Sequence, residues 1–161
     1  MLRCGLPPLP PISSFQRDIS HHLTLLAEGR AAGEGMLPHV VRHSLDEESE
    51  SGEGEGGRGS GLLVDIAWPA QQVALQVQGP EMYSLASRSA LGPSQFKGRL
   101  MRASGWTVVD VPFWEWDQLG ANEGHKVSYL CTRLGVPCAA CETNGLICGD
   151  CAAVMWKMAH F

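Results

Sequence analysis

Residues 62–78 read LLVDIAWPAQQVALQVQ, and this stretch decides the fold because it encodes two short strands joined by a tight connection. Apolar and β-branched residues dominate Leu62–Trp68 and Val73–Val77, as is typical of strands. The four residues between them, 69–72, begin with a proline and break the apolar pattern. The segment therefore predicts a β-hairpin with a four-residue turn.

The register of this hairpin places polar side chains together. If the turn is symmetric, paired residues have numbers that sum to 141, so Asp65 is expected to face Gln76 across the ladder. Side chains alternate along a strand, so Gln78 shares the face of Gln76. On the opposite face lie Val73, Leu75 and Val77. We expect one apolar face and one polar face, and a slip by one residue would remove this arrangement.

Helical and extended patterns flank the hairpin. The first predicted helix lies between Ser13 and Gly29 and begins with a Ser13–Gln16 capping box. A second helix is capped by Ser94 and runs to Ala103, with Phe96 and Leu100 facing inward, and a strand follows at Trp106–Val111. The last helix is capped by Asn122 and ends at Gly135. A mixed β-sheet flanked by helices is the compact solution for this order. We therefore predict an α/β domain over residues 13–137.

Composition limits what surrounds that domain. The 161 residues allow one domain with tails: a proline-rich segment 1–12, an acidic Gly/Ser/Glu-rich linker 46–60 expected to be a disordered loop, and a small cysteine-rich tail 138–161. Without the linker, 11 basic and 11 acidic residues remain, which excludes a strongly basic nucleic-acid-binding surface. No apolar run approaches a membrane span, so no membrane partner is expected.

Four of the six cysteines are arranged as two Cys-x-x-Cys pairs. Cys138-Ala-Ala-Cys141 and Cys148-Gly-Asp-Cys151 are six residues apart. Four thiolates are the number and type of ligand that tetrahedral Zn²⁺ takes. In zinc-ribbon sites, however, the two Cys-x-x-Cys pairs are usually separated by roughly 15–20 residues. The sequence indicates a structural zinc site and no other cofactor; a reduced flexible tail and a redox dithiol remain as alternatives.

Several short motifs follow one another in order along the domain. They are Val64-Asp65-Ile66-Ala67, Val73 to Pro80, Lys97, Leu100, Gly105-Trp106-Thr107-Val108-Val109, Trp114-Glu115-Trp116 and Tyr129-Leu130. This ordered set resembles the RAP domain of FAST-kinase-like and organellar helical-repeat proteins, over about residues 13–134. The resemblance implies a restriction-endonuclease-like fold of the PD-D/E-x-K type. It also implies RNA binding in a mitochondrion or chloroplast, in RNA processing, stability or translation.

One motif departs from the family. Where family members read Glu-Val-Asp-Gly-Pro, this chain has Gln76-Val77-Gln78-Gly79-Pro80, so two carboxylates are replaced by amides. A Mg²⁺-dependent nuclease needs clustered anionic oxygens beside the scissile phosphate. The departure favours a module without catalytic residues. The alternative is a divergent endoribonuclease built around Asp65, with Glu81 or Asp110 as the second acid.

Three kinds of side chain are candidates for contact with single-stranded RNA. The hydrogen-bonding groups are Asp65, Gln76 and Gln78. The cations that could contact phosphates are Arg88, Lys97, Arg99 and Arg102. The aromatic rings that could stack on bases are Tyr83 and Trp114. The competing interpretation is an ordinary solvated sheet face and helix face, with the aromatic rings in the core, as we expect for Trp106 and Trp116.

The expected partners follow from the same resemblance. They are single-stranded RNA and a helical-repeat RNA-binding protein or segment, whereas DNA is not expected. A zinc-stabilised protein-interaction module is the third interpretation of the chain.

Overall fold

The computed structural model describes residues 12–28, 40–44, 62–84, 86–138, 141 and 148–158. In chain order its elements are α1 (Ser14–Glu28), β1 (Val40–Ser44), β2 (Leu63–Trp68), β3 (Val73–Gln78), α2 (Gly92–Ala103), β4 (Thr107–Pro112), α3 (Phe113–Gln118), α4 (Glu123–Leu134) and α6 (Gly149–Met158). The proline-rich residues 1–11 and the acidic linker lie outside the described ranges. Within those ranges, no helix has the length and apolar character needed to cross a membrane.

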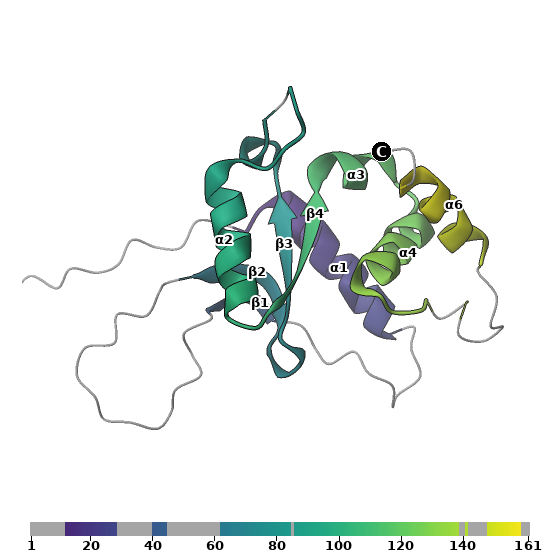
Figure 1. Ribbon diagram of the computed structural model, residues 1–161. Helices are drawn as coiled ribbons and strands as arrows, with labels where there is room; N and C mark the ends of the chain where they lie inside the picture. The colour runs from purple at the N-terminus through teal and green to yellow at the C-terminus, as the bar shows by residue number, and fades with distance from the viewer. Residues whose placement is uncertain are drawn as a thin grey trace, which may run out of the picture.

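The four strands form one mixed sheet in the order β1-β2-β3-β4 (Figure 1). β1 and β3 both run antiparallel to β2, whereas β4 runs parallel to β3 after the crossover through α2. The hairpin pairs Ile66 with Leu75, Ala67 with Ala74 and Trp68 with Val73, which confirms the predicted register. β1 was not predicted, because its five residues carry too little apolar pattern to stand out.

The hairpin ladder ends earlier than expected. Its pairs stop at Ile66 and Leu75, so the facing pair of Asp65 and Gln76 is not formed. Instead, the Asp65 carboxylate accepts a hydrogen bond of 3.0 Å from the backbone N–H of Val77. The side chain thus takes an acceptor position that a backbone carbonyl would otherwise fill, which is a common use of aspartate at the end of regular structure.

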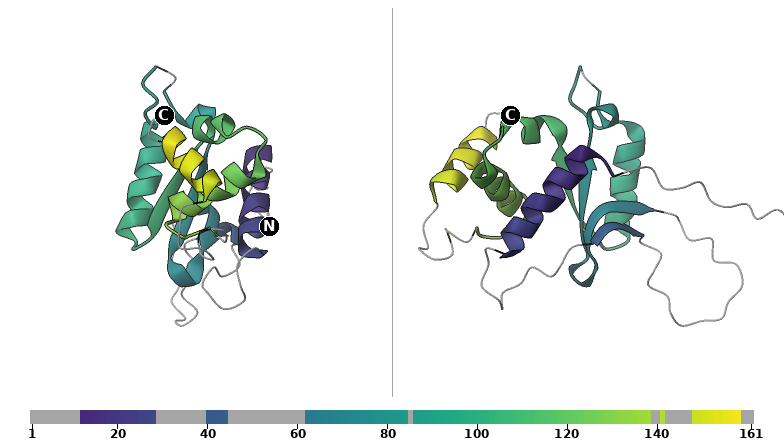
Figure 2. Two further views of the ribbon diagram at one scale, coloured as in Figure 1. Left: turned by 90° about the vertical axis from the view of Figure 1, so that its right-hand side faces the viewer. Right: turned by 180° about the vertical axis from the view of Figure 1, so that it is seen from behind.

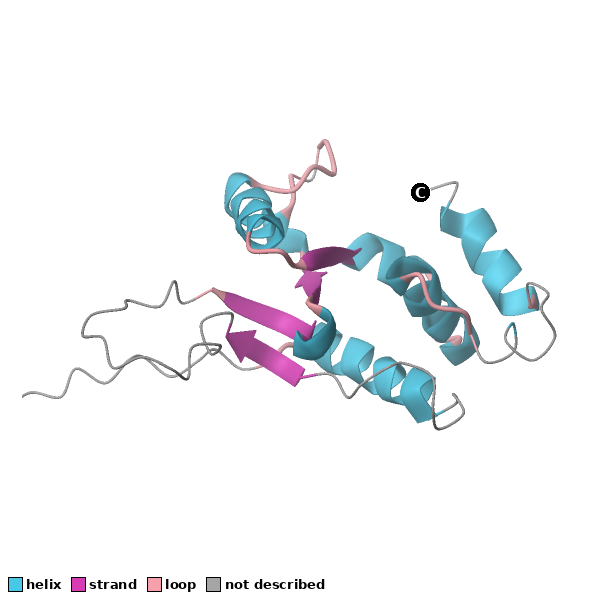
Figure 3. Ribbon diagram, turned by 60° about the horizontal axis from the view of Figure 1, so that its bottom comes forward, coloured by secondary structure: helices cyan, strands magenta, loops and turns pink. Residues whose placement is uncertain are grey.

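Helices cover both faces of the sheet, which confirms the α/β class. α2 lies on one face, and its Met101 packs with Val64, Ala67 and Ala74 (Figures 1 and 3). α1 and α4 lie on the other face, over the larger core (Figure 2). The central members of that core are Ile19, Leu23, Ile66, Leu75, Val111, Trp116, Tyr129 and Leu130. Two apolar clusters separated by the sheet therefore stabilise the domain.

α2 differs from the sequence expectation in its start and in its buried face. The helix begins at Gly92 with Pro93 in its first turn, so Ser94 lies inside the helix and does not cap it. Phe96 is 61% exposed, whereas Gly98 and Met101 are buried. A Cβ at Gly98 would lie 3.5 Å from Nε2 of Gln76, which is an ordinary van der Waals contact, so this part of α2 lies directly on the sheet.

The predicted caps of α1 and α4 are present, although the side chain of Gln16 donates to the backbone oxygen of Asp65 and so does not complete the capping box with Ser13. The predicted end of the first helix at Gly29 lies outside the described residues. The Ser13 hydroxyl accepts a hydrogen bond of 3.0 Å from the backbone N–H of Gln16, and the Asn122 side chain accepts one of 3.1 Å from that of His125. Gly135 ends α4 with a φ of +68°, a left-handed conformation that favours glycine. The short helix α3, which begins directly after β4, was not predicted.

The described part of the cysteine-rich tail packs on the domain. α6 lies along α4, and Cys151 and Val154 are buried in the larger core (Figure 2). Lys157 donates to the backbone oxygen of Gln118 at 3.3 Å. The described cysteines are thus held next to α4.

Candidate nucleic-acid interface and cysteine cluster

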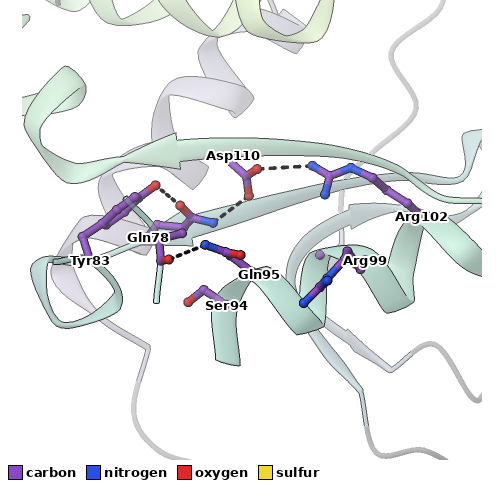
Figure 4. Close-up of a pocket in the computed structure, with 9 residues that line it drawn as sticks. Gln78, Tyr83, Ser94, Gln95, Arg99, Arg102 and Asp110 are labelled. Carbon is purple, nitrogen blue, oxygen red and sulfur yellow. Dashed lines mark hydrogen bonds and ion pairs between the residues drawn. The ribbon is translucent and has the colours of Figure 1, made fainter. Parts of the chain in front are cut away.

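A cleft of about 300 Å³ opens between α2 and the carboxyl ends of β3 and β4 (Figure 4). It is lined by Gln78, Tyr83, Ala90, Ser94, Gln95, Gly98, Arg99, Arg102 and Asp110. Its volume is at the lower end of the range for small-ligand sites. The lining is therefore suited to a group about the size of a nucleotide.

Strand register brings the polar residues of the cleft together. β3 and β4 are parallel with Gln76 beside Asp110, so alternate residues of both strands point toward α2. Gln76 is 3% exposed and Gln78 is 4% exposed. The two amides therefore lie beneath α2 and not on an ordinary solvated sheet face, and Gln78 lines the cleft whereas Gln76, which was also predicted to contact RNA, is buried outside both pockets.

A chain of hydrogen bonds organises the floor of the cleft. The Tyr83 hydroxyl donates to Oε1 of Gln78, whose Nε2 donates to Oδ1 of Asp110 at 2.7 Å. On its other oxygen, Asp110 accepts from Nη2 of Arg102 at 3.4 Å. Both ends of the Gln78 amide are thus engaged, which fixes its orientation.

Burial perturbs the two titratable groups of this chain. It raises the pKa of Asp110 above its ordinary value, while the positive charge of Arg102 acts in the opposite direction. Burial also raises the pKa of Tyr83 to about 12, assisted by the negative charges of Asp110 and Glu115. Tyr83 is therefore a neutral hydrogen-bond donor at physiological pH. Perturbed groups in a cleft are typical of functional sites.

The basic residues predicted on α2 do not all reach the cleft. Arg99 and Arg102 line it, whereas Lys97 is half-buried outside the lining. Arg102 remains half-exposed beside Asp110, so its guanidinium is accessible to a ligand. Two cations from one helix thus stand at one wall of the cleft, where they can contact phosphate groups.

An aromatic pocket of about 260 Å³ adjoins the cleft. It is lined by Tyr83, Ser84, Arg88, Phe113 and Trp114, so Tyr83 belongs to both pockets. The rings of Tyr83 and Trp114 are 4.3 Å apart with an interplanar angle of 73°. The Arg88 guanidinium lies 5.9 Å from the centre of the Trp114 ring. Because α3 begins immediately after β4, Trp114 is held beside the end of the cleft.

Other predicted residues have structural positions. Asp65 is in neither pocket, and its backbone oxygen accepts a hydrogen bond of 2.8 Å from Gln16 of α1. Trp116 is buried as expected, and its indole N–H donates to Asp18 at 2.8 Å. Trp106 is half-buried against the cluster beneath α2.

Sequence reasoning did not place Asp110, Ser94 or Gln95 in the nucleic-acid site. In the sequence analysis, Asp110 was named only as a possible second catalytic acid of the alternative endoribonuclease. The signal that could have found it is the parallel register of β3 and β4, which was not predicted.

The four cysteines of the two Cys-x-x-Cys pairs converge. Their sulfur atoms all lie within 4.8 Å of one another, and Sγ of Cys138 is 3.3 Å from that of Cys141, 3.5 Å from that of Cys148 and 3.4 Å from that of Cys151. Four sulfurs at Zn–S bond lengths of about 2.3 Å would be roughly 3.8 Å apart in a tetrahedron. The donor set and its size therefore fit a metal ion such as zinc.

Backbone groups support this cluster. The N–H of Cys148 donates to Sγ of Cys141 at 3.3 Å, and that of Cys151 donates to Sγ of Cys148 at 3.4 Å. The second of these lowers the pKa of Cys148 to about 7, whereas burial raises the pKa of Cys138. Hydrogen bonds of this kind stabilise thiolate ligands and fix their orientation.

Unlike the four cysteines, the described carboxylates do not gather in a group of three or more. Among the described residues, the cysteine cluster is the one group of three or more His, Cys, Asp or Glu side chains that are close enough to hold an ion. Asp110 is beside an amide and a guanidinium, and neither supplies the anionic oxygens that Mg²⁺ prefers. Among the residues that line the cleft, Asp110 is the one carboxylate.

Comparison with known proteins identifies similarity to one family. The family model of the RAP domain matches residues 75–133, a segment that contains most of β3, all of α2, β4 and α3, and most of α4. The chain is also 32% identical over 75 residues to a protein of Oryza sativa subsp. japonica named RAP domain-containing protein, chloroplastic. That similarity covers 47% of this chain but only 12% of the rice protein.

Proposed function

The chain carries a RAP domain, and from this premise we propose that it binds single-stranded RNA in organellar RNA metabolism without itself cleaving RNA. The observation that carries the proposal is the joining of a polar, arginine-lined cleft to an aromatic pocket through Tyr83. Single-stranded RNA is recognised by this combination, because its unpaired bases can stack while its phosphates contact cations.

The charge distribution supports a local mode of binding. Arg99 and Arg102 in the cleft and Arg88 at the aromatic pocket are available for phosphates, while the rest of the chain has no basic excess. Few phosphates can therefore be neutralised, and the dependence of affinity on salt should be shallow. Two pockets of this size hold one or two nucleotides. We infer that a helical-repeat RNA-binding protein or segment supplies the remaining contacts.

The organelle belongs to the same proposal. The rice relative is named as chloroplastic, which supports an organellar location. Because the RAP-domain resemblance implies a mitochondrion or a chloroplast, we propose that this chain acts in one of these two organelles. RNA processing, stability and translation are the processes in which such a module would act.

Fluorescence anisotropy of a labelled single-stranded RNA, titrated with the full chain at two salt concentrations, tests RNA binding. We expect Trp114→Ala to weaken binding by about tenfold, because base stacking contributes on the order of 1–3 kcal/mol per base. Arg99→Ala and Arg102→Ala should weaken binding and make the salt slope shallower. The matched controls are Trp156→Ala and Lys157→Ala on α6, which should bind as the unmodified chain does.

Two outcomes would overturn the proposal. The first is no binding at low salt, and the second is an equal loss of binding in the α6 controls. Cleavage of RNA that depends on Mg²⁺ and disappears in Asp65→Ala would instead establish the endoribonuclease alternative.

The cysteine cluster carries a second proposal. We propose that Cys138, Cys141, Cys148 and Cys151 hold a structural zinc ion that fastens α6 to α4. Elemental analysis of the reduced protein should find about one zinc per chain, which Cys138→Ser should remove. Cys131, which is buried outside the cluster, provides the control Cys131→Ala. Reduced protein without zinc after purification in its presence would contradict the proposal.

The protein-interaction alternative rests on α6 itself. This helix exposes Met155 by 48% and Trp156 by 66%, which is unusual for side chains of this size. If the unmodified chain retained zinc but bound no RNA, this surface and the zinc site would become the leading features of the molecule.

A further inference from the structure

The cleft has a single carboxylate among its lining residues, and its position is informative. Asp110 lies on the floor, between the amide of Gln78 and the guanidinium of Arg102 (Figure 4). The other charged lining residues are the arginines of α2. An RNA-binding cleft gains nothing from a carboxylate that faces a phosphate, since the two anions repel each other. Asp110 should therefore face a different part of the ligand.

The chemistry of a carboxylate defines that part. An ionised carboxylate only accepts hydrogen bonds and offers about four acceptor positions on its two oxygens. Gln78 uses one position at 2.7 Å, and Arg102 uses another at the longer distance of 3.4 Å. The remaining acceptor positions on Asp110 can therefore bind only a ligand group that donates a hydrogen bond. In RNA the donors are ribose hydroxyls and the N–H groups of bases.

The order of side chains along the cleft favours the ribose. Figure 4 shows Tyr83, Gln78, Asp110 and Arg102 in a row, and the centre of the Trp114 ring lies 4.3 Å from that of the Tyr83 ring. Aromatic ring, acceptor and cation thus follow one another. A ribonucleotide has the matching order of base, ribose and phosphate. A base stacked at the aromatic end, with its phosphate at the arginine end, would bring its ribose to Asp110.

We propose, on the basis of the RNA binding proposed above, that Asp110 makes the cleft selective for RNA by accepting a hydrogen bond from a ribose 2′-hydroxyl. The 2′-hydroxyl is the group by which a protein distinguishes RNA from DNA. Gln78 and Tyr83 act as positioning residues, because their hydrogen bonds hold the carboxylate in place. One such bond to a charged acceptor corresponds to a preference of about tenfold.

The test compares three labelled oligonucleotides of the same base sequence: RNA, 2′-O-methyl RNA and DNA. The full chain should bind RNA about tenfold more tightly than either of the others, because only RNA has a donor at the 2′ position. Asp110→Ala should bind all three within about twofold of one another. Its unchanged or stronger binding of DNA shows that the cleft remains formed. The control Asp117→Ala, at an exposed carboxylate outside this cleft, should keep the preference.

Each result has a distinct meaning. Binding of RNA and DNA with equal affinity by the unmodified chain would overturn this inference and leave the proposed RNA binding intact. A preference for RNA that persists in Asp110→Ala would also overturn it, because another group would then read the hydroxyl. Binding of none of the three would overturn the proposed function and this inference with it.

Discussion

Asp110 has a charge in a place where burial makes that charge costly. Its carboxyl group is partly shielded from water by α2, and burial is the main reason why its pKa is raised. A residue selected only for stability would avoid this position or have a stronger partner than an arginine at 3.4 Å. Groups that cost stability yet sit in a cleft are typical of sites kept for function.

This argument predicts that Asp110→Asn does not lower the melting temperature at pH 7. Because folding raises the pKa of the carboxyl, its stabilising contribution is present below the ordinary value near 3.8 and is lost as pH rises through the folded value. The amide keeps the shape and an acceptor for Gln78 without the buried charge. Thermal unfolding followed by circular dichroism between pH 3 and pH 8 measures this. A Tm several degrees lower at pH 7 would show that the carboxylate is there for stability.

At the scale of elements, α2 combines a packing role with a binding role. Met101 packs in the smaller core, while Arg99 and Arg102 line the cleft one turn apart. Gly98 lies between these functions, in the middle of a helix, where glycine costs about 0.5–1 kcal/mol relative to alanine. A Cβ there would lie 3.0 Å from Nη1 of Arg102, so the absence of a side chain at Gly98 leaves room for the Arg102 guanidinium in this position.

We therefore expect Gly98→Ala to fold normally while binding RNA less tightly. The helix gains propensity, so the free energy of unfolding should stay unchanged or rise by up to about 1 kcal/mol. The methyl group displaces the flexible end of Arg102 and narrows the cleft, so affinity for RNA should fall several-fold. Chemical denaturation and anisotropy measure the two effects. The matched control is Gly92→Ala, where a Cβ meets nothing within 4 Å, and it should leave RNA binding unchanged.

At the scale of the whole molecule, Asp18 connects helices that are far apart in sequence. Its carboxylate accepts from Nζ of Lys126 at 2.7 Å and from the Trp116 indole at 2.8 Å, so α1, α3 and α4 meet at one group. Burial alone would raise the pKa of Asp18, but these hydrogen bonds hold it below its ordinary value. The ionised form therefore stabilises the packing of helices over the sheet.

Asp18→Asn should lower the melting temperature at pH 7 and have little effect in acid. Because the pKa is lowered by folding, the contribution is present above the ordinary value near 3.8 and is lost as pH falls through the folded value. A partly exposed ion pair contributes up to about 1 kcal/mol, which corresponds to roughly 2–4 °C. Calorimetry at pH 7 and pH 3 checks this, and a difference that is as large at pH 3 as at pH 7 would contradict it.

The cysteine cluster and the proposed RNA-binding cleft lie in different parts of the molecule. α6 packs on the outer side of α4, whereas the cleft is formed by α2 with β3 and β4 (Figure 1). Removal of zinc with a chelator under reducing conditions should lower the melting temperature and the helical signal, because a metal that binds the folded chain stabilises it. The Kd for RNA should change by less than about twofold. Loss of RNA binding on chelation, restored by added zinc, would show that the cluster supports the cleft.

Features that depend on neighbours in sequence could be predicted. The hairpin register, the Ser13 and Asn122 caps and the end of α4 at Gly135 follow from contacts within a few residues. The order of motifs was sufficient to indicate the RAP family, and the match over residues 75–133 confirms it. The Cys-x-x-Cys pairs likewise indicated four ligands, and their sulfurs do converge.

Features that depend on what packs from elsewhere could not be predicted. The inward face of α2 was assigned to Phe96 because that residue is apolar, but the small residue Gly98 is what fits against Gln76. In the same way, the parallel pairing of β3 with β4 places Asp110 beside the amides. The sequence by itself determined the hairpin, the caps of α1 and α4 and the resemblance to the RAP domain, because hydrophobic period, caps and turns act locally. Only the tertiary structure decided which polar groups are buried together as a site, because burial and strand register depend on contacts between distant residues.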